Sequence, residues 1–199
     1  MLTFDDASHT YRWNGRTVPG VTSLLQPIHD FSKVPADVLR MAQERGTYVH
    51  RMTELFDLGE LDEDANASVA DGLYARYLVG WKRFLVDYAP NWAEIEEKGY
   101  SKLFGFAGTW DRAGRFERRD PGRWLVDIKT SLDPADAWGV QVAAYRQLRM
   151  ERDASTATDR RGTVQLNADG SYSLIEWTGS TDWDCFHALL TLHNWRASR

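Results

Sequence analysis

The sequence has few of the residues that would indicate a secreted, membrane-bound or cluster-binding protein. Cys185 is its single cysteine, so an internal disulfide is excluded, and an iron–sulfur cluster, which takes about four thiolates, is not expected. No run of eighteen apolar residues and no charged leader followed by an apolar stretch is present, so we expect neither a membrane span nor a signal peptide. A cytoplasmic setting follows as the expectation.

The chain also lacks a net positive charge. The 199 residues include 24 Lys and Arg against 29 Asp and Glu, which gives a formal net charge of −5. A global positive field is therefore not what brings a partner to this protein. The charges are uneven, however: residues 54–71 contain acids and no base, whereas residues 112–161 contain more Lys and Arg than Asp and Glu. A polyanion would approach the second region and avoid the first.

The composition that is present indicates a globular domain. The hydrophobic fraction is 43%, with nine Trp, and a chain of this length buries a sizeable core. We expect one domain over residues 1–199, in which residues 1–90 form an N-terminal hairpin and helices. Residues 91–199 would form a sheet core that carries the functional site.

The first ninety residues predict a hairpin followed by helices. Asn14-Gly15 is a strong two-residue turn signal between the strands of a hairpin over residues 2–18. A short helix is expected near residues 22–25, ended by Pro27. Apolar periodicity then predicts one helix over about residues 35–58 and a second over about residues 65–88.

The remaining residues predict an α/β arrangement, one sheet with helices on its faces. A turn near Gly114, Pro121 and Gly122 separates the second and third strands of the sheet. The expected elements, in order, are strands near 92–100, 105–111 and 124–130, a helix capped by Asp133 or Asp136 that carries Gln141 and Tyr145, a hairpin of 163–166 and 172–177, and a closing helix from Thr181.

Two of these strands bring ionisable side chains to one place. Side chains alternate along a strand, so Asp127 and Lys129 share a face about 7 Å apart, and Trp124, Val126 and Ile128 share the other. If the preceding strand pairs beside this one, Asp111 reaches the same spot. Two buried carboxylates and an ammonium are costly without compensation, and a divalent cation is the usual compensation.

The same residues fall within a series of motifs. Together, in this order, they resemble the PD-(D/E)XK nuclease superfamily, and within it the RecB-like, phage-type exonucleases; Gly20 is a minor departure, since phage relatives often have Ser there. The matching segments are His9 to Thr22 at the entry, Arg45-Gly46-Thr47-Tyr48-Val49-His50, Gly108-Thr109-Trp110-Asp111, Asp127-Ile128-Lys129-Thr130, and Gln141 with Tyr145.

The resemblance implies a restriction-endonuclease-like core with a central mixed β-sheet flanked by α-helices, and it assigns roles. It implies one or two Mg²⁺ or Mn²⁺ ions. The upstream glutamate is Glu97 or Glu96, and Glu97 is favoured because Tyr100 follows it by three residues. The implied metal ligands are His50, Glu97, Asp111, Asp127 and the Ile128 carbonyl, the catalytic residues are Glu97, Asp111, Asp127 and Lys129, and Gln141 and Tyr145 support the site or touch DNA.

Several of these residues have an ordinary structural interpretation as well. Lys129 can be a counter-charge for Asp127, and His50 can be a satisfied helix histidine. Gln141 and Tyr145 can be helix packing. Arg115, Arg118 and Arg119 form, with Arg123, a candidate phosphate-contact cluster, but arginine-rich turns are also common on solvated surfaces.

The function implied by the resemblance is metal-dependent exonucleolytic hydrolysis of DNA phosphodiester bonds, of a phage recombination type in a bacterial host. The alternatives are an endonuclease or nickase on the same core, and a DNA-binding protein without catalysis. DNA is the expected partner. A phage annealing or single-strand-binding protein and a second copy of the chain are further candidate partners.

Overall fold

The computed structural model describes residues 1–5, 8–29, 34–68 and 72–199. Its centre is a five-stranded sheet in the order β4-β5-β6-β7-β8. The β6–β7 pair is parallel, and the three other pairs are antiparallel, so the sheet is mixed, as expected. The strands are β4 (Pro90–Tyr100), β5 (Ala107–Phe116), β6 (Gly122–Lys129), β7 (Arg160–Leu166) and β8 (Tyr172–Glu176).

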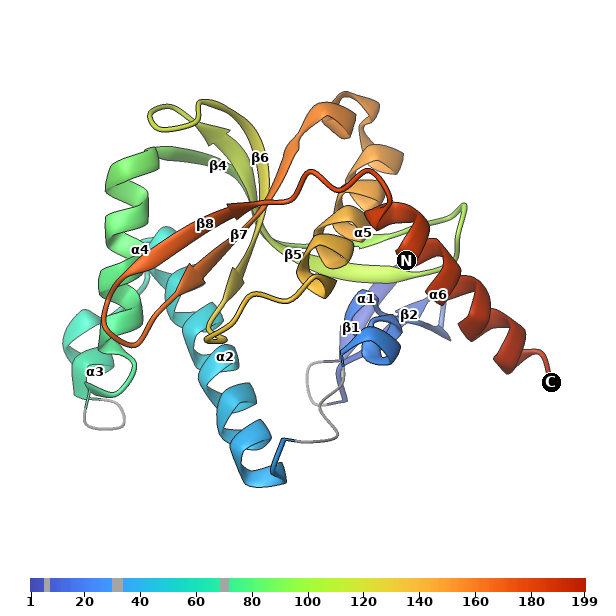
Figure 1. Ribbon diagram of the computed structural model, residues 1–199, viewed down its shortest axis with the longest axis horizontal. Helices are drawn as coiled ribbons and strands as arrows, with labels where there is room; N and C mark the ends of the chain where they lie inside the picture. Colours follow the sequence, from blue (N-terminus) through green and yellow to red (C-terminus); the bar gives the residue numbers. More distant parts are fainter. Residues whose placement is uncertain (6–7, 30–33, 69–71) are drawn as a thin grey trace.

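Helices cover both faces of this sheet (Figure 1). On one face lie α2 (Ala36–Asp57) and α4 (Ala75–Tyr88), and on the other lie α1 (Val21–Leu24), α5 (Ala137–Arg152) and α6 (Asp182–Ala197). The predicted alternation of β6 is confirmed, because Trp124, Val126 and Ile128 join the core beneath α2 and α4, and Leu125 joins the core beneath α5. The mixed α/β fold class predicted from the sequence is therefore observed.

The N-terminal hairpin is confirmed and gains a third strand. The order is β1-β2-β3, with β1 at Leu2–Asp5, β2 at Thr10–Trp13 and β3 at Arg16–Val18. Asn14 and Gly15 have φ values of 49° and 80°, as a tight hairpin turn with two positive φ angles requires. Pro27 lies within a short 3₁₀ turn, Gln26–Ile28, that directly follows α1.

Three local expectations are corrected. The helix predicted over residues 65–88 is two helices, α3 (Glu63–Ser68) and α4, and Gly72 with φ 76° begins the turn before α4; Val69, assigned to that stripe, lies outside the described residues. Gly114 is not in a turn but within β5, where an added Cβ would lie 2.2 Å from the Asn91 carbonyl oxygen. Asp136 holds the N-cap position of α5 without a side-chain capping bond. A last 3₁₀ turn, Ala154–Thr158, joins α5 to β7.

Among the described residues, no helix is both long and apolar enough to cross a bilayer.

Candidate functional site

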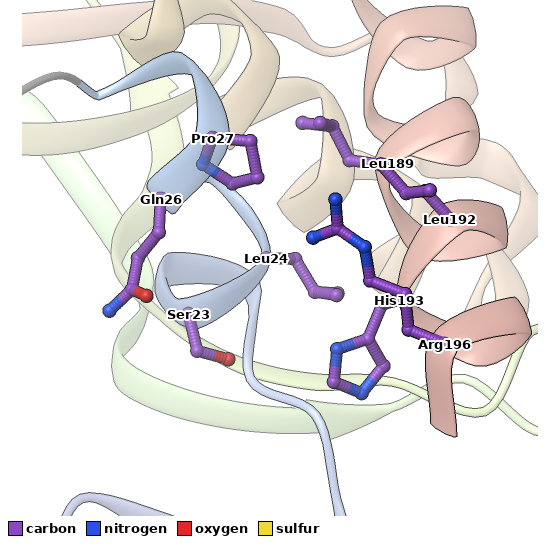
Figure 2. A pocket seen from close by; sticks show the side chains of 8 residues that line it. All are labelled: Ser23, Leu24, Gln26, Pro27, Leu189, Leu192, His193 and Arg196. Atoms are coloured by element: carbon purple, nitrogen blue, oxygen red, sulfur yellow. The ribbon is translucent and has the colours of Figure 1, made fainter. Parts of the chain in front are cut away.

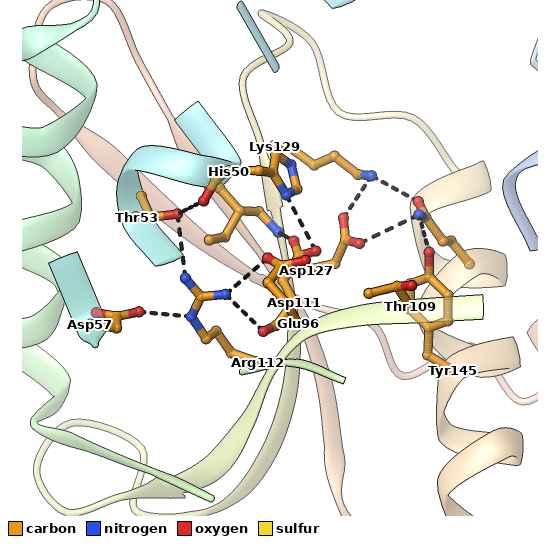
Figure 3. Close-up of polar contacts among 12 residues, drawn as sticks. His50, Thr53, Asp57, Glu96, Thr109, Asp111, Arg112, Asp127, Lys129 and Tyr145 are labelled. Atoms are coloured by element: carbon orange, nitrogen blue, oxygen red, sulfur yellow. Dashed lines mark hydrogen bonds and ion pairs between the residues drawn. The ribbon is translucent and has the colours of Figure 1, made fainter. Parts of the chain in front are cut away.

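Four elements meet at the candidate site. Helix α2 supplies His50, and the neighbouring strands β4, β5 and β6 supply Glu96, Asp111 and Asp127. Figure 3 shows these side chains pointing toward one another, with Lys129 above them and Tyr145 to one side. One ligand atom from each of His50, Glu96 and Asp111 lies within 4.8 Å of the others. The site thus joins one helix to three adjacent strands of the sheet.

Asp111 is at the centre of this group. Asp111 is 5% exposed, and its Oδ2 accepts a hydrogen bond from the backbone N–H of Ile128 at 2.5 Å. Its Oδ1 lies 3.3 Å from Nδ1 of His50. The first contact joins β5 to β6 and the second joins β5 to α2, so Asp111 is fixed on two sides.

Asp127 and Lys129 share a face of β6, as alternation predicts. Lys129 Nζ lies 2.6 Å from Asp127 Oδ2 and donates a hydrogen bond to Gln141 Oε1 at 2.8 Å. Gln141 in turn donates to Asp127 Oδ1 at 3.4 Å and to the Tyr145 hydroxyl at 2.9 Å. The two helix residues expected at the site are therefore part of its hydrogen-bond network.

The glycine of the Gly-x-x-Asp motif has a packing reason. A Cβ at Gly108 would lie 2.8 Å from Cε1 of Tyr145 and 2.9 Å from Cγ2 of Val21. Only a residue without a side chain allows the Tyr145 ring to pack this close to β5. Because Tyr145 contacts Gln141, Gly108 helps to place the amide that contacts Asp127 and Lys129.

The position of the upstream glutamate corrects our expectation. Ile95 pairs with Arg112 and Glu97 with Trp110, so Glu96 is level with Asp111. Glu97 instead pairs with Arg152 at 3.1 Å, with 46% of its side chain exposed, against 22% for Glu96. The backbone of Glu96 has φ 50°, a left-handed conformation that interrupts strand alternation, and spacing from Tyr100 cannot reveal such an irregularity.

A buried arginine that the sequence analysis did not assign holds Glu96. Arg112 is fully buried, and its Nη1 donates to Glu96 Oε1 at 3.0 Å and to the Asp111 carbonyl at 2.8 Å. Its Nε lies 2.7 Å from Oδ2 of Asp57, the last residue of α2. The signal was present: alternation puts Arg112 on one face of β5 with Phe116, an inward position for a charged side chain.

The crowding of acids shifts the pKa values of the site in opposite directions. Burial and the charge of Asp111 raise the pKa of Glu96 to about 7, although His50 and Arg112 oppose this. Burial also raises the pKa of Asp127, to about 6, against the opposing charge of Lys129. Burial would raise the pKa of Asp111, but His50 and the Ile128 amide hold it below its ordinary value.

His50 compensates part of this negative charge. Burial alone would lower the pKa of His50, but the charge and hydrogen bond of Asp111, with Asp127 and Glu96 nearby, raise it to about 9. A metal ion would take over this compensation from the imidazole proton, because histidine binds a metal in its neutral form. The set of oxygen donors with one imidazole fits a hard divalent metal such as Mg²⁺ or Mn²⁺.

The arginines of the β5–β6 turn are not brought to this site. Arg115, Arg118 and Arg119 lie at the opposite end of β5 and β6 from Lys129. Arg115 pairs with Glu117 at 3.4 Å and Arg119 with Asp87 at 2.9 Å. Arg118 donates to the Val86 carbonyl. These contacts are to Glu117 and to the end of α4, so the phosphate contact expected of the three arginines is not supported by their placement.

A separate pocket lies between α1 and α6. It has a volume of about 160 Å³, and Figure 2 shows Leu24 and Pro27 on one side and Leu189, Leu192 and Arg196 on the other. None of the site residues described above lines it. The candidate site is therefore distinct from this hollow.

Comparisons with known proteins support the fold alone. No family model matches the sequence, and no curated protein matches it. A crystal structure from Eubacterium rectale described as a "Putative exonuclease" superposes with a TM-score of 0.54 at 12% identity, over 87% of this chain and 77% of that chain. The structure of SSO0001 superposes over 86% of this chain and 72% of that chain at 16% identity, but its TM-score of 0.40 does not establish a shared fold. The chain thus shares its fold with the Eubacterium rectale protein.

Proposed function

We propose that this protein is a metal-dependent nuclease of the PD-(D/E)XK type that hydrolyses DNA, acting as an exonuclease. The observation that carries the proposal is the meeting of His50, Glu96 and Asp111 donor atoms within 4.8 Å, beside the Asp127–Lys129 pair. The name of the Eubacterium rectale neighbour agrees with it, although a likeness at 12% identity establishes only the fold.

The ligands that we assign are His50, Glu96, Asp111 and Asp127, with the Ile128 carbonyl as a further oxygen donor. Bound Mg²⁺ or Mn²⁺ would supply Lewis-acid neutralisation of phosphate charge and a lower pKa for water. Asp127 fits a ligand role because it is a buried carboxylate near Asp111, and its Oδ2 is balanced by Lys129 at 2.6 Å.

The remaining residues position and stabilise the reacting groups. Hydrolysis adds water oxygen to phosphorus and breaks one phosphorus–oxygen ester bond, which leaves a phosphomonoester and a hydroxyl. Lys129 donates a hydrogen bond to Gln141 and lies against Asp127. We therefore assign Lys129 to stabilising the charge that develops on phosphate, with Gln141 and Tyr145 holding it in place.

The first test uses linear and covalently closed circular DNA, with Mg²⁺, Mn²⁺ or EDTA. An exonuclease degrades only the linear DNA, and only with metal. Loss of both substrates would indicate an endonuclease, and conversion of closed circles to nicked circles a nickase. Binding without cleavage of either would contradict the hydrolase proposal and favour a DNA-binding protein. Asp127→Asn serves as the inactive control.

The phage recombination setting and the protein partners belong to the same proposal. An annealing or single-strand-binding protein and a second copy of the chain are the partners to test. Light scattering of the purified protein alone and with DNA measures self-association directly.

A further inference from the structure

Arg45 is hydrogen-bonded to the residue that follows the strand carrying Asp127 and Lys129. It lies on α2, five residues before His50, and its side chain is half-buried. Its Nε donates a hydrogen bond to Oγ1 of Thr130 at 3.3 Å. Thr130 directly follows Lys129, so the guanidinium group is held beside the final residue of β6.

The charge of Arg45 has no acidic partner among the described residues. Two other arginines of α2 show the contrast: Arg40 pairs with Glu44 at 3.3 Å, and Arg51 pairs with Glu54 at 2.6 Å. The one hydrogen bond of Arg45 uses Nε and leaves both terminal nitrogens without a partner in the same residues. An arginine whose position is fixed and whose terminal donors remain open can bind an anion with two parallel hydrogen bonds.

A second basic side chain, Lys129, lies near Arg45 at the end of β6. Gly46, the next residue of α2, also faces the end of β6, since a Cβ there would lie 4.0 Å from Thr130 Oγ1, an ordinary contact distance. Arg45 and Lys129 therefore place two basic side chains near the end of β6, next to a site whose other side is acidic.

We propose that Arg45 binds a backbone phosphate of the DNA strand whose scissile phosphate faces Lys129. Thr130 orients the guanidinium through Nε, and the two terminal nitrogens contact phosphate oxygens. The contact reads no base, so it strengthens binding to every sequence alike. This inference rests on the proposed function for the identity of the ligand, and it assigns to Arg45 the backbone contact that was expected from Arg115, Arg118 and Arg119.

A purely structural role for Arg45 makes a different prediction. If the side chain only tethers α2 to β6, its removal lowers stability and changes metal affinity through His50. If it binds phosphate, its removal weakens DNA binding and reduces the salt dependence of that binding, because each phosphate contact releases a counterion. The two roles are therefore separated by the slope of log affinity against log salt.

The experiment measures anisotropy of a fluorescein-labelled single-stranded oligonucleotide between 50 and 200 mM salt, conditions in which counterion release is readily seen. Ca²⁺ replaces Mn²⁺, and a gel checks that the DNA stays intact. The variants are Arg45→Ala, Arg45→Lys and Thr130→Val. Arg40→Ala is the matched control, since it removes the same charge from the same helix. Melting temperature and calorimetric Mn²⁺ affinity are measured for each.

We expect Arg45→Ala to weaken binding about tenfold at the lowest salt and to reduce the slope by about 0.7. Arg45→Lys should keep the slope and lose part of the affinity, and Thr130→Val should do the same. Arg40→Ala should match the wild type. Mn²⁺ affinity should be unchanged throughout, and in cleavage assays Arg45→Ala should raise KM more than it lowers kcat.

The inference is overturned if Arg45→Ala and Arg40→Ala give the wild-type slope, or if Arg45→Ala changes only the melting temperature. Its failure is distinct from failure of the proposed function. A wild-type protein that binds DNA through Arg45 and cleaves nothing would overturn hydrolysis and keep the phosphate contact. A wild-type protein that binds no DNA would overturn both.

Discussion

Arg112 Nη1 lies 3.0 Å from Glu96 Oε1, and the same nitrogen donates to the backbone carbonyl of Asp111. One buried guanidinium therefore holds two strands of the candidate site together. Through Nε it also pairs with Asp57, the last residue of α2, at 2.7 Å. Because α2 carries His50, this network sets the position of the helix relative to β4 and β5.

Replacing Asp57 by Ala should destabilise the protein strongly. The side chains of Arg112 and Asp57 are 0% and 2% exposed. Removing Asp57 takes away the acceptor of both Arg112 Nε and the Trp81 indole N–H, and leaves Glu96 as the one carboxylate paired with Arg112 among the described residues. We expect a loss of about 3–5 kcal/mol in the free energy of unfolding. Urea denaturation measures it. Glu44→Ala, which breaks an exposed pair on the same helix, should cost less than about 1 kcal/mol. Equal losses would contradict the assigned role of Arg112.

Substitutions of the two adjacent glutamates should have different effects on cleavage. Glu96→Gln should abolish metal-dependent cleavage because Glu96 is level with Asp111, whereas Glu97→Gln should leave cleavage near the wild-type rate because Glu97 only pairs with Arg152. Rates on linear DNA with Mn²⁺ measure both. The opposite pattern would mean that Glu97, favoured on motif spacing, is the residue that acts, and that the left-handed Glu96 has a structural role.

Asp127 and Lys129 should have different effects on binding and on turnover. Asp127→Asn should lower both Mn²⁺ affinity and turnover. Lys129→Ala leaves the carboxylates in place, so Mn²⁺ should bind as well as before or more tightly. Its turnover should fall by at least about 100-fold, the usual scale for losing an electrostatic stabiliser. Calorimetric titration beside cleavage rates gives the comparison. Near wild-type turnover in Lys129→Ala would make Lys129 a mere counter-charge.

Metal should stabilise the folded protein through the proposed ligands. A cation that binds only the native state at 100 times its Kd adds about 2.7 kcal/mol to the free energy of unfolding. We therefore expect Mn²⁺ to raise Tm and EDTA to reverse the increase. Asp111→Asn should remove the response. A rise in Tm that is the same in Asp111→Asn would place the bound cation elsewhere, and cleavage that persists in EDTA would contradict the metal requirement.

Gly108→Ala should disturb the site through packing. The added Cβ would lie 2.8 Å from the Tyr145 ring, and overpacking of this kind typically costs about 1–3 kcal/mol. Displacement of Tyr145 should also lower turnover through Gln141. Gly46→Ala is a control for stability, because its Cβ meets only Thr130 Oγ1 at 4.0 Å, and in a helix it should stabilise by about 0.5–1 kcal/mol. Urea denaturation compares the two. An unaffected Gly108→Ala would show that the ring has room to move.

The sequence by itself determined the elements that local chemistry controls. The Asn14-Gly15 turn, the long helix that carries His50, and the alternation along Trp124–Lys129 follow from turn propensity and from apolar periodicity. The same alternation placed Asp127 and Lys129 on one face. These features depend on residues close in sequence, so the pattern alone was sufficient.

Tertiary structure decided what depends on contacts between distant segments. Glu96, and not Glu97, lies level with Asp111 in the pairing of β4 with β5. Glu96 has a left-handed conformation within its strand, and the rule of side-chain alternation does not predict such a residue. Burial of Arg112 needs Asp57 from α2, 55 positions away, and the arginines of the β5–β6 turn were separated from the site by the direction of the strands. The free energy of a buried charge depends on the partners that the fold supplies, and a linear pattern of residues does not contain them.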